Sequence, residues 1–485
     1  MLTKSDLIKY FENGIKEKGH EKIGTEHEKF VYNKSNHSLI PYRGDQSITT
    51  LLKAFIEDGW KPKFEDENII ALLKDNASIT LEPGGQFELS GAPLDTVHDT
   101  CREINNHLTF VKTIEKKMNI GFLGVGFLPI EDLKSVPHVP KKRYSEIMRP
   151  YMKKLGGLGL DMMHRSCTVQ ANFDYTSEKD MKKKIMVSAA LQPLVTGLFA
   201  NSPFNDGRLN GYQSYRSFVW SKTDKDRTGI LKSMIGKNFS FEEYVDYALN
   251  VPVYSIIRDG NYINCLDYTF DDLMNNKFDQ INKEDLNIDD WTDHLSTIFT
   301  EVRLKTYIEM RGADAGNYRS LCALPAFWAG ILYCSDCLEE SLSIINDWSY
   351  EDIVSFSSSV CKNGLDTKLK DISGWELAHQ FLKISTKGLE SRSNLNTVGE
   401  NETIHIDYLY DIVHKKENSA IRLKNLYEGK WNKPIDHQSL YKNKKKSLIS
   451  KTKLKNLKIH NLFCPPGSVS IHSCFAVHGS NESRG

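Results

Sequence analysis

The chain has 485 residues, and 63 basic side chains balance 63 acidic ones, so its formal net charge is zero. This balance gives no electrostatic basis for binding nucleic acid or a membrane surface. The first residues lack the apolar segment of a secretory signal and the Arg-rich composition of an import segment, and no uncharged apolar run reaches the roughly 18 residues of a membrane helix. We therefore predict a cytoplasmic globular protein.

Apolar spacing predicts helices and strands in an irregular order. We expect helices at 3–18, 47–58, 92–118, 144–154, 178–200 with an interruption near Pro193, 241–249, 289–299 and 323–346, and helices over most of 350–428. We expect strands at 23–32, 39–42, 121–128, 167–175 and 307–311, and two short strands within 78–90 around the turn Pro83-Gly84-Gly85. Because the helices between the strands vary in length, the pattern favours an α+β fold with a mainly antiparallel sheet.

The C-terminal part of the chain differs in composition from the rest. Residues 441–458 contain eight lysines and no acid, and a segment rich in Pro, Gly, Ser, His and Cys follows. We predict one large domain at 1–435, within which 350–430 forms a helical satellite region, and a disordered tail at 436–485. The cysteines and histidines of the tail have a spacing that matches no common structural zinc site.

Nine cysteines are an odd and modest number for this length, which is typical of a reduced chain with buried thiols. Cys334 and Cys337 have the spacing of a zinc or redox site. Their surroundings, 327–345, have the pattern of an amphipathic helix, and no second Cys-x-x-Cys lies nearby. The pattern favours packing of both thiols in the core over a metal or redox function.

Four predicted strands carry polar groups on one face and apolar groups on the other. Because residues two apart on a strand share a face, the spacing groups Glu26 with Glu28, Gln170 with Asn172, and Glu309 with Arg311, while Glu88 lies between apolar neighbours. One interpretation is that these faces contact water, but such faces usually carry Lys, Thr and Ser beside mixed charges. The other is a concave sheet that binds a cation, since clustered carboxylates repel one another without one. The pattern alone leaves both open.

Glutamate and amide oxygens suit Mg²⁺ or Mn²⁺ better than Zn²⁺. Mg²⁺ held by carboxylates usually completes its shell with water and substrate phosphates, which points to a nucleotide enzyme. The sequence contains no P-loop motif, and the glycines at 156–159 are more typical of a plain turn than of a phosphate loop.

Many segments resemble, in the same order, those of the plant and proteobacterial glutamate–cysteine ligases. The resemblance begins at Gly24-Thr25-Glu26-His27-Glu28 and covers roughly residues 1–435. The segments that carry it are 23–30, 80–91, 140–144, 163–174, 200–204, 215–220, 301–314 and 324–328. So many matches in order are far more specific than any single motif.

The resemblance implies a glutamine-synthetase-like catalytic fold, in which a curved, mainly antiparallel sheet forms a funnel surrounded by helices. It implies that ATP drives ligation of the γ-carboxylate of L-glutamate to the amine of L-cysteine through a γ-glutamyl phosphate. The product would be γ-glutamylcysteine, formed in the first step of glutathione biosynthesis. The expected cofactors are two or three Mg²⁺ ions, with Mn²⁺ as an alternative, and the expected state is a monomer or a homodimer.

The resemblance also assigns roles to individual residues. The metal ligands it implies are Glu26, Glu28, Glu82, Glu88, Gln170 and Glu309. Glu309 and Arg311 are the expected catalytic pair, and the expected substrate-binding residues are Arg216, for the glutamate α-carboxylate, then Arg143, Arg165 and Arg258, and Trp220 beside the cysteine side chain. The resemblance further implies a disulfide between Cys101 and Cys322.

Two other functions fit the same residues. A related ligase could join glutamate to a different amine, because only the acceptor pocket would differ. An inactive relative could act as a binding or regulatory protein, although the apparently complete set of acidic residues argues against it.

Overall fold

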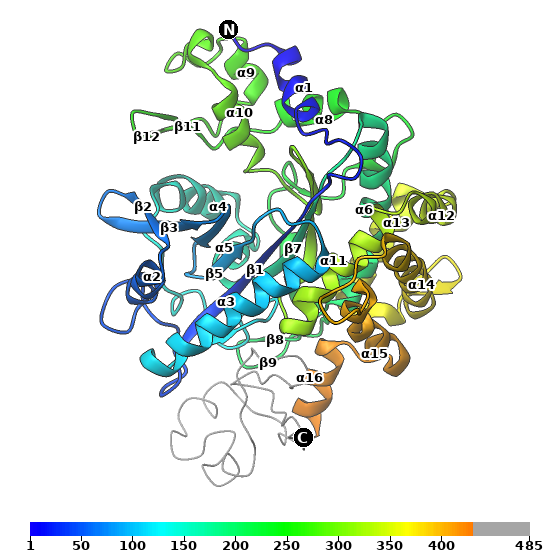
Figure 1. Ribbon diagram of the computed structural model, residues 1–485. Helices are drawn as coiled ribbons and strands as arrows, with labels where there is room; N and C mark the ends of the chain where they lie inside the picture. The colour runs from blue at the N-terminus through cyan, green and yellow to red at the C-terminus, as the bar shows by residue number, and fades with distance from the viewer. Residues whose placement is uncertain (430–485) are drawn as a thin grey trace.

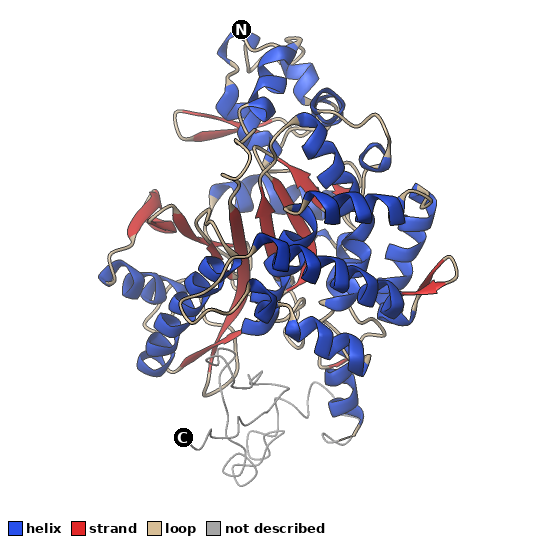
Figure 2. Ribbon diagram, turned by 45° about the vertical axis from the view of Figure 1, so that its right-hand side comes forward, coloured by secondary structure: helices blue, strands red, loops and turns tan. Residues whose placement is uncertain are grey.

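The computed structural model describes residues 1–429, and a nine-stranded sheet runs through the middle of them (Figure 1). The strand order is β14-β15-β7-β1-β5-β4-β3-β2, and β6 also pairs with β1. Every pairing in this sheet is antiparallel. The sheet and its surrounding helices (Figure 2) confirm the predicted α+β class with a mainly antiparallel sheet.

The strands of the main sheet are β1 Ile23–Asn33, β2 Lys61–Glu65, β3 Asn68–Lys74, β4 Ala77–Leu81, β5 Phe87–Ser90, β6 Ile120–Leu123, β7 Thr168–Phe173, β14 Val302–Leu304 and β15 Ile308–Asp314. Four two-stranded pairs lie outside it: β8 Phe204–Asn205 with β9 Arg208–Leu209, β10 Thr228–Gly229 with β13 Phe299–Thr300, β11 Ser255–Arg258 with β12 Asn261–Asn264, and β16 Lys368–Leu369 with β17 Ile372–Ser373.

The α-helices are α1 Lys4–Glu12, α2 Ile48–Glu57, α3 Val97–Met118, α4 Arg149–Leu155, α5 Gly159–Arg165, α6 Glu178–Leu198, α7 Tyr215–Trp220, α8 Phe241–Leu249, α9 Phe270–Met274, α10 Ile288–Leu295, α11 Tyr318–Leu332, α12 Ser335–Ile345, α13 Tyr350–Asn363, α14 Gly374–Arg392, α15 Asp407–Lys415 and α16 Ser419–Glu428. A π-helix, η1, spans Arg143–Met148, and short 3-10 helices span η2 Lys232–Ile235, η3 Lys283–Asp285, η4 Gly364–Asp366 and η5 Glu402–His405.

Strand β1 is the longest strand of the sheet and pairs with β5, β6 and β7. Helix α3 runs beside it (Figure 1); the Thr96 side chain caps this helix by accepting a hydrogen bond from the Asp99 backbone, and Asn119 ends it in the left-handed conformation. Helix α11 packs against β7 and is buried along nearly its whole length. An apolar helix of this kind is stable only inside a core.

Several predicted elements differ from the structure. Residues 39–42 form only an isolated bridge through Leu39, and the β2–β3 hairpin was not predicted, because β2 is largely exposed and lacks an apolar alternation. Helix α6 continues through Pro193 without a break. The strand predicted at 121–128 ends at Leu123.

The helix predicted at 323–346 is two helices, α11 and α12, which meet at a bend of 88°. Cys334 lies at this bend with extended backbone and caps α12. Within residues 1–429, no single helix is long and apolar enough to cross a membrane, and the α11–α12 pair meets the length and composition criteria only as a bent pair.

The region predicted as a helical satellite contains α13, α14, α15 and α16, of which α13 packs against α6 and α14 against α11. The domain boundaries at 435 and 350–430 stay predictions. The tail at 436–485 lies outside the described residues.

Helices α11 and α14 approach most closely where Gly330 meets Gly388. A Cβ atom on Gly388 would lie 1.7 Å from the carbonyl oxygen of Gly330, and a Cβ on Gly330 would lie 2.1 Å from the carbonyl oxygen of Ser385. Both distances are far inside van der Waals contact and involve backbone atoms, so the two helices can pack this closely only with glycine at both positions.

We expect Gly388→Ala to lower the free energy of unfolding by about 1–3 kcal/mol, because the added methyl group must push α14 away from α11. Denaturant-induced unfolding measures the change. Lys383→Ala, at an exposed position of the same helix, is the matched control and should change stability by no more than about 0.5 kcal/mol. A Gly388→Ala protein as stable as the control would show that the helices separate without cost.

Candidate functional site

A cavity of about 440 Å³ lies over the polar face of the main sheet. The charged and amide side chains that line it are Glu26, Glu28, Glu82, Glu88, Gln86, Gln170, Arg143, Arg216, Arg303, Lys305 and Arg311. The lining also includes Trp220, Tyr144, Phe299 and several methionines. Its size fits a small-molecule substrate site.

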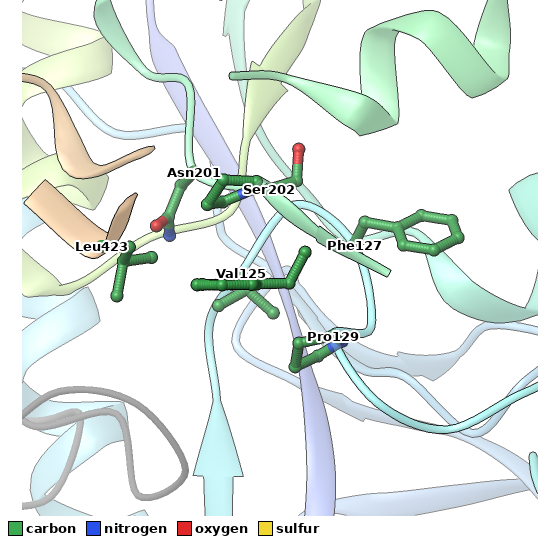
Figure 3. A pocket seen from close by; sticks show the side chains of 8 residues that line it. Val125, Phe127, Pro129, Asn201, Ser202 and Leu423 are labelled. Carbon is green, nitrogen blue, oxygen red and sulfur yellow. The ribbon is translucent and has the colours of Figure 1, made fainter. Parts of the chain in front are cut away.

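A second cavity encloses only about 10 Å³ (Figure 3). Its lining includes the apolar side chains of Val125, Phe127 and Leu423. This is about the space of one water molecule, so it is too small for a substrate.

The acidic end of the large cavity is built by the register of β1 with its neighbours. Glu28 lies opposite Glu88 of β5, and Glu26 lies opposite Gln170 of β7. Side chains directly opposite on antiparallel strands have Cβ atoms about 5 Å apart, so these groups converge. Glu82, in the turn after β4, lines the same cavity. The sequence-predicted grouping on one sheet face therefore matches the observed geometry.

Burial and the charges of neighbouring carboxylates disfavour the ionised forms of Glu26, Glu28 and Glu88. Burial, with the charge of Glu82, raises the pKa of Glu28 to about 8. Burial and the charges of Glu26 and Glu82 raise the pKa of Glu88 well above its usual value. A divalent cation among them would favour the ionised forms, and a cluster of carboxylate oxygens is the ligand set that Mg²⁺ prefers. The acidic end therefore fits a hard cation.

The other end of the cavity is basic and is organised around the fully buried Glu309. Arg303 donates to both Glu309 carboxylate oxygens at 2.8 Å, Lys305 lies 3.4 Å away, and Arg311 also donates to Glu309. Burial opposes ionisation of Glu309, but the charges of Arg303, Lys305 and Arg311 hold its pKa below the usual value. Arg311 also donates to the Gln170 side chain at 2.7 Å. Glu309 thus fixes a set of cations that face the cavity.

Glu309 itself does not belong to the cavity lining. Three cationic groups already neutralise its carboxylate. This geometry favours a positioning role for Glu309 over the predicted role of metal ligand. Arg311, its expected catalytic partner, does line the cavity, beside a register irregularity between Met310 and Ala313 of the kind that redirects side chains near sites.

Arg216, in the first turn of α7, is buried and lines the cavity. Its Nη2 donates to the carbonyl oxygen of Arg311 at 2.8 Å, and its buried Nε has no hydrogen-bond partner among residues 1–429. The hydroxyls of Ser202 and Ser214 donate to Asp314 at 2.6 and 2.8 Å, and the backbone N–H of Arg216 donates to Ser202 Oγ. This network holds a guanidinium group with an unused donor at the cavity.

Trp220 ends α7 with its ring 5.7 Å from the Arg216 guanidinium and 5.8 Å from the Phe299 ring. Its buried indole N–H has no hydrogen-bond partner in the described part of the chain. Arg143, at the start of η1, also lines the cavity. The structure therefore brings both of these predicted residues to the site.

Two predicted substrate arginines lie elsewhere. Arg165 pairs with Asp161 at 2.9 Å and with Asp206 at 3.1 Å, and its guanidinium lies over the Phe127 ring. Arg258 pairs with both oxygens of Asp290, at 2.7 and 2.8 Å. Neither residue lines the large cavity. Both guanidinium groups form structural ion pairs, of which those with Asp206 and Asp290 join residues far apart in the sequence and could not be read from it.

Arg303 and Lys305 were not predicted as site residues. They lie two apart on and just after β14, directly before the predicted strand with Glu309 and Arg311. The same period of two that grouped Glu309 with Arg311 also places Arg303 and Lys305 on one face. That signal was present in the sequence.

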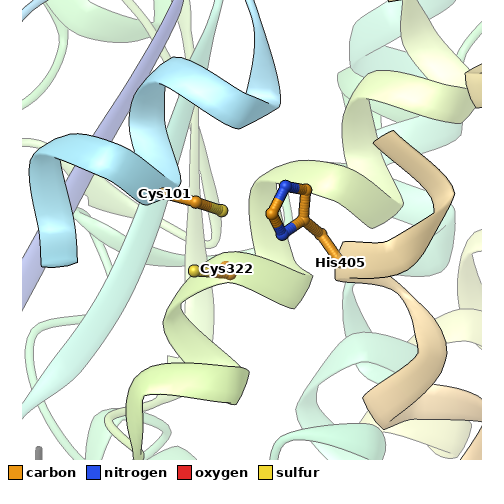
Figure 4. A group of neighbouring side chains, drawn as sticks. All are labelled: Cys101, Cys322 and His405. Carbon is orange, nitrogen blue, oxygen red and sulfur yellow. The ribbon is translucent and has the colours of Figure 1, made fainter. Parts of the chain in front are cut away.

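Cys101 of α3 and Cys322 of α11 are buried free thiols in the structure (Figure 4). Their sulfur atoms and a ring nitrogen of His405 lie within 4.8 Å of one another. The structure thus brings together the two cysteines of the predicted disulfide without joining them.

The comparisons with known proteins agree with the family resemblance seen in the sequence. The family model described as glutamate–cysteine ligase family 2 matches residues 22–439. The chloroplastic glutamate–cysteine ligase of Medicago truncatula is 48% identical over 437 residues, which cover 90% of this chain and 84% of that protein. The chloroplastic enzyme of Arabidopsis thaliana is 46% identical over 436 residues, with coverage of 90% and 82%.

Among solved structures, glutamate–cysteine ligase from Francisella tularensis, in complex with AMP, matches with a TM-score of 0.51 at 12% identity. The match covers 84% of this chain and 85% of that chain, which indicates a shared fold.

The curated relatives are chloroplastic, so the prediction of a cytoplasmic protein is wrong. It rested on the N-terminal composition and on the lack of a long uncharged apolar run, which do not determine the compartment.

We expect Glu28→Gln to stabilise the chelator-treated protein at about pH 8, by on the order of 2 kcal/mol. The pKa of Glu28 is raised to about 8 in the folded state from an ordinary value of 4.5. The folded state therefore binds more protons, so the wild type loses stability as the pH rises from about 4.5 to 8. Urea unfolding at about pH 4, 6 and 8 measures this difference.

At about pH 4 the advantage of Glu28→Gln should be smallest, because the carboxyl group is then largely protonated in both states. Glu12→Gln, at an exposed position of α1, is the control and should follow the wild-type profile. Parallel pH profiles for wild type and Glu28→Gln would contradict the raised pKa.

Proposed function

The chain belongs to glutamate–cysteine ligase family 2, and from this we propose that it forms γ-glutamylcysteine from L-glutamate and L-cysteine at the expense of ATP. The observation that supports this proposal most directly is the division of one cavity into an acidic and a basic end. An acidic end suits metal ions with a triphosphate, and a basic end suits carboxylate and phosphoryl groups. On the same relatives we propose a plastid location.

The reaction requires activation of an unreactive group. A carboxylate is a poor electrophile, so the γ-carboxylate of glutamate first attacks the terminal phosphorus of ATP and ADP leaves. The resulting γ-glutamyl phosphate carries a good leaving group. The cysteine amine then attacks the acyl carbon, phosphate departs, and the amine loses a proton.

We assign the acidic end to the cation site. Glu26, Glu28, Glu82 and Glu88 would hold Mg²⁺, with Mn²⁺ as an alternative, and two or three ions match the number of carboxylates. When bound, these ions neutralise the triphosphate and stabilise charge on the transferring phosphoryl group. Gln170 offers its side-chain oxygen to Arg311 in this structure, so it links the two ends of the cavity.

We assign the basic end to the anions of the substrate. Arg216 has an unused buried donor and would bind the glutamate α-carboxylate. Arg311 would contact the phosphoryl group, while Glu309 and Gln170 hold its guanidinium in place. Glu309 already orders the side chains of Arg303, Lys305 and Arg311. These three cations therefore need little reorganisation as negative charge develops in the transition state.

Two finer assignments rest on the relatives and on proximity. Trp220, next to Arg216, would form one wall of the cysteine pocket. The nearby thiols of Cys101 and Cys322 would form a disulfide between α3 and α11 under oxidising conditions.

The direct test measures γ-glutamylcysteine by mass spectrometry and ADP release in parallel, with glutamate, ATP and Mg²⁺. We expect product with cysteine, none without Mg²⁺, and a loss of about 100-fold or more in kcat/KM for Glu28→Gln. Glu12→Gln is the control and should match the wild type. ADP release with another amine but not with cysteine would overturn the acceptor assignment, and full activity of Glu28→Gln would overturn its metal role.

Arg216→Lys should raise the KM for L-glutamate about tenfold or more, because an ammonium group cannot make the bidentate contact. The KM for ATP should change much less. Arg165→Lys is the matched control, since Arg165 is equally buried but lies outside the cavity, and its KM for glutamate should equal that of wild type. Steady-state kinetics with varied glutamate separates the two outcomes, and equal effects of both substitutions would refute the assignment.

A further inference from the structure

Cys334 and Cys337 lie in the first turn of α12, at the corner between α11 and α12. Their sulfur atoms are 2.8 Å apart, and the Cys334 sulfur accepts a hydrogen bond from the backbone N–H of Cys337 at 3.4 Å. Cys334 is therefore both the cap of an eleven-residue helix and the direct neighbour of a second thiol. The expected core packing of both thiols is observed, but so is a dithiol geometry.

The two thiols differ chemically. Burial opposes ionisation of Cys334, but hydrogen bonds with Cys337 and Ser391 lower its pKa below the usual value. Burial and the contact with Cys334 raise the pKa of Cys337 to about 12. Cys334 is also 9% exposed, whereas Cys337 is fully buried. A thiol at a helix N-terminus that ionises readily is the attacking member of a pair, and the protonated neighbour resolves it.

A metal site is a poorer fit for this pair. Among residues 1–429, the one group of three or more His, Cys, Asp and Glu side chains close enough to hold a metal ion is Cys101, Cys322 and His405. The pair in α12 thus supplies only two ligands from that part of the chain, and a structural zinc ion takes four. None of the side chains that line the large cavity comes from α12 either. The dithiol therefore stands apart from the ligation site.

We propose that Cys334 and Cys337 form a thiol–disulfide exchange site that reacts with small-molecule disulfides. The Cys334 thiolate attacks one sulfur of the disulfide, and the other half leaves as a thiolate, which gives a mixed disulfide on Cys334. The Cys337 sulfur then loses its proton and attacks Cys334, which releases the second half. The protein dithiol gives up two electrons and two protons, and the small disulfide becomes two thiols.

The test exposes the reduced, full-length protein to bis(2-hydroxyethyl) disulfide at neutral pH, with alkylation by N-ethylmaleimide and peptide mass mapping over time. In the wild type we expect a Cys334–Cys337 disulfide with no retained hydroxyethylthio adduct. Cys337→Ser should retain the adduct on Cys334, and Cys334→Ser should leave Cys337 unmodified. Serine at 334 keeps an oxygen that can cap α12, so the fold is expected to persist.

Cys361, a buried cysteine of α13 that pairs with no other cysteine of residues 1–429, is the internal control. Cys334 should exchange about tenfold or more faster than Cys361, and Cys361→Ser should behave as the wild type. Equal, slow reaction of Cys334 and Cys361, or an adduct that persists on wild-type Cys334, would overturn the proposal. Both results come from the wild-type protein itself, so they hold even if a variant unfolds.

Discussion

The register of β1 between β5 and β7 is the constraint on which the site depends. It places Glu28 opposite Glu88 and Glu26 opposite Gln170. A shift of one residue would turn these carboxyl groups to the other face of the sheet. That other face is packed against α3 and α11, and it already holds the buried side chains of His27 and Lys29. The apolar core behind the sheet therefore sets the acidic end in front of it.

The two ends of the cavity differ in how the negative charge of their carboxylates is balanced. At the basic end, Glu309 is surrounded by Arg303, Lys305 and Arg311, so its charge is compensated inside the protein. At the acidic end, Glu28 and Glu88 repel each other and their neighbours, so compensation must come from protons or from a bound cation.

The sequence predicted the parts of the site that follow from strand periodicity and family resemblance. Glu26 and Glu28 could be grouped because residues two apart share a face, and Glu88 could be identified as an acid between apolar neighbours. Arg216 ranked above Arg165 and Arg258 in the prediction, but the ion pairs that Arg165 and Arg258 form with Asp206 and Asp290 arise only in the tertiary fold. Sequence patterns show which side chains are charged, but not which charges are already paired.

The fold was predictable to a similar degree. The class and the long strands follow from pattern, whereas the exposed hairpin strand β2 has no apolar face to detect. The corner at Cys334 was missed because both α11 and α12 have helical spacing, and only the cap between them separates the two helices.

The hydrogen bond from the Arg216 side chain to the backbone carbonyl of Arg311 affects which length of substrate the site can bind. Arg311 lies on β15, and Arg216 is hydrogen-bonded to the backbone of the same strand. The distance between the two guanidinium groups is therefore fixed by that strand. If they bind the two ends of the substrate, as proposed, a dicarboxylate one methylene shorter cannot reach both. Discrimination between L-glutamate and L-aspartate would then arise from backbone geometry. A ratio of their kcat/KM values near one would exclude this origin of the discrimination.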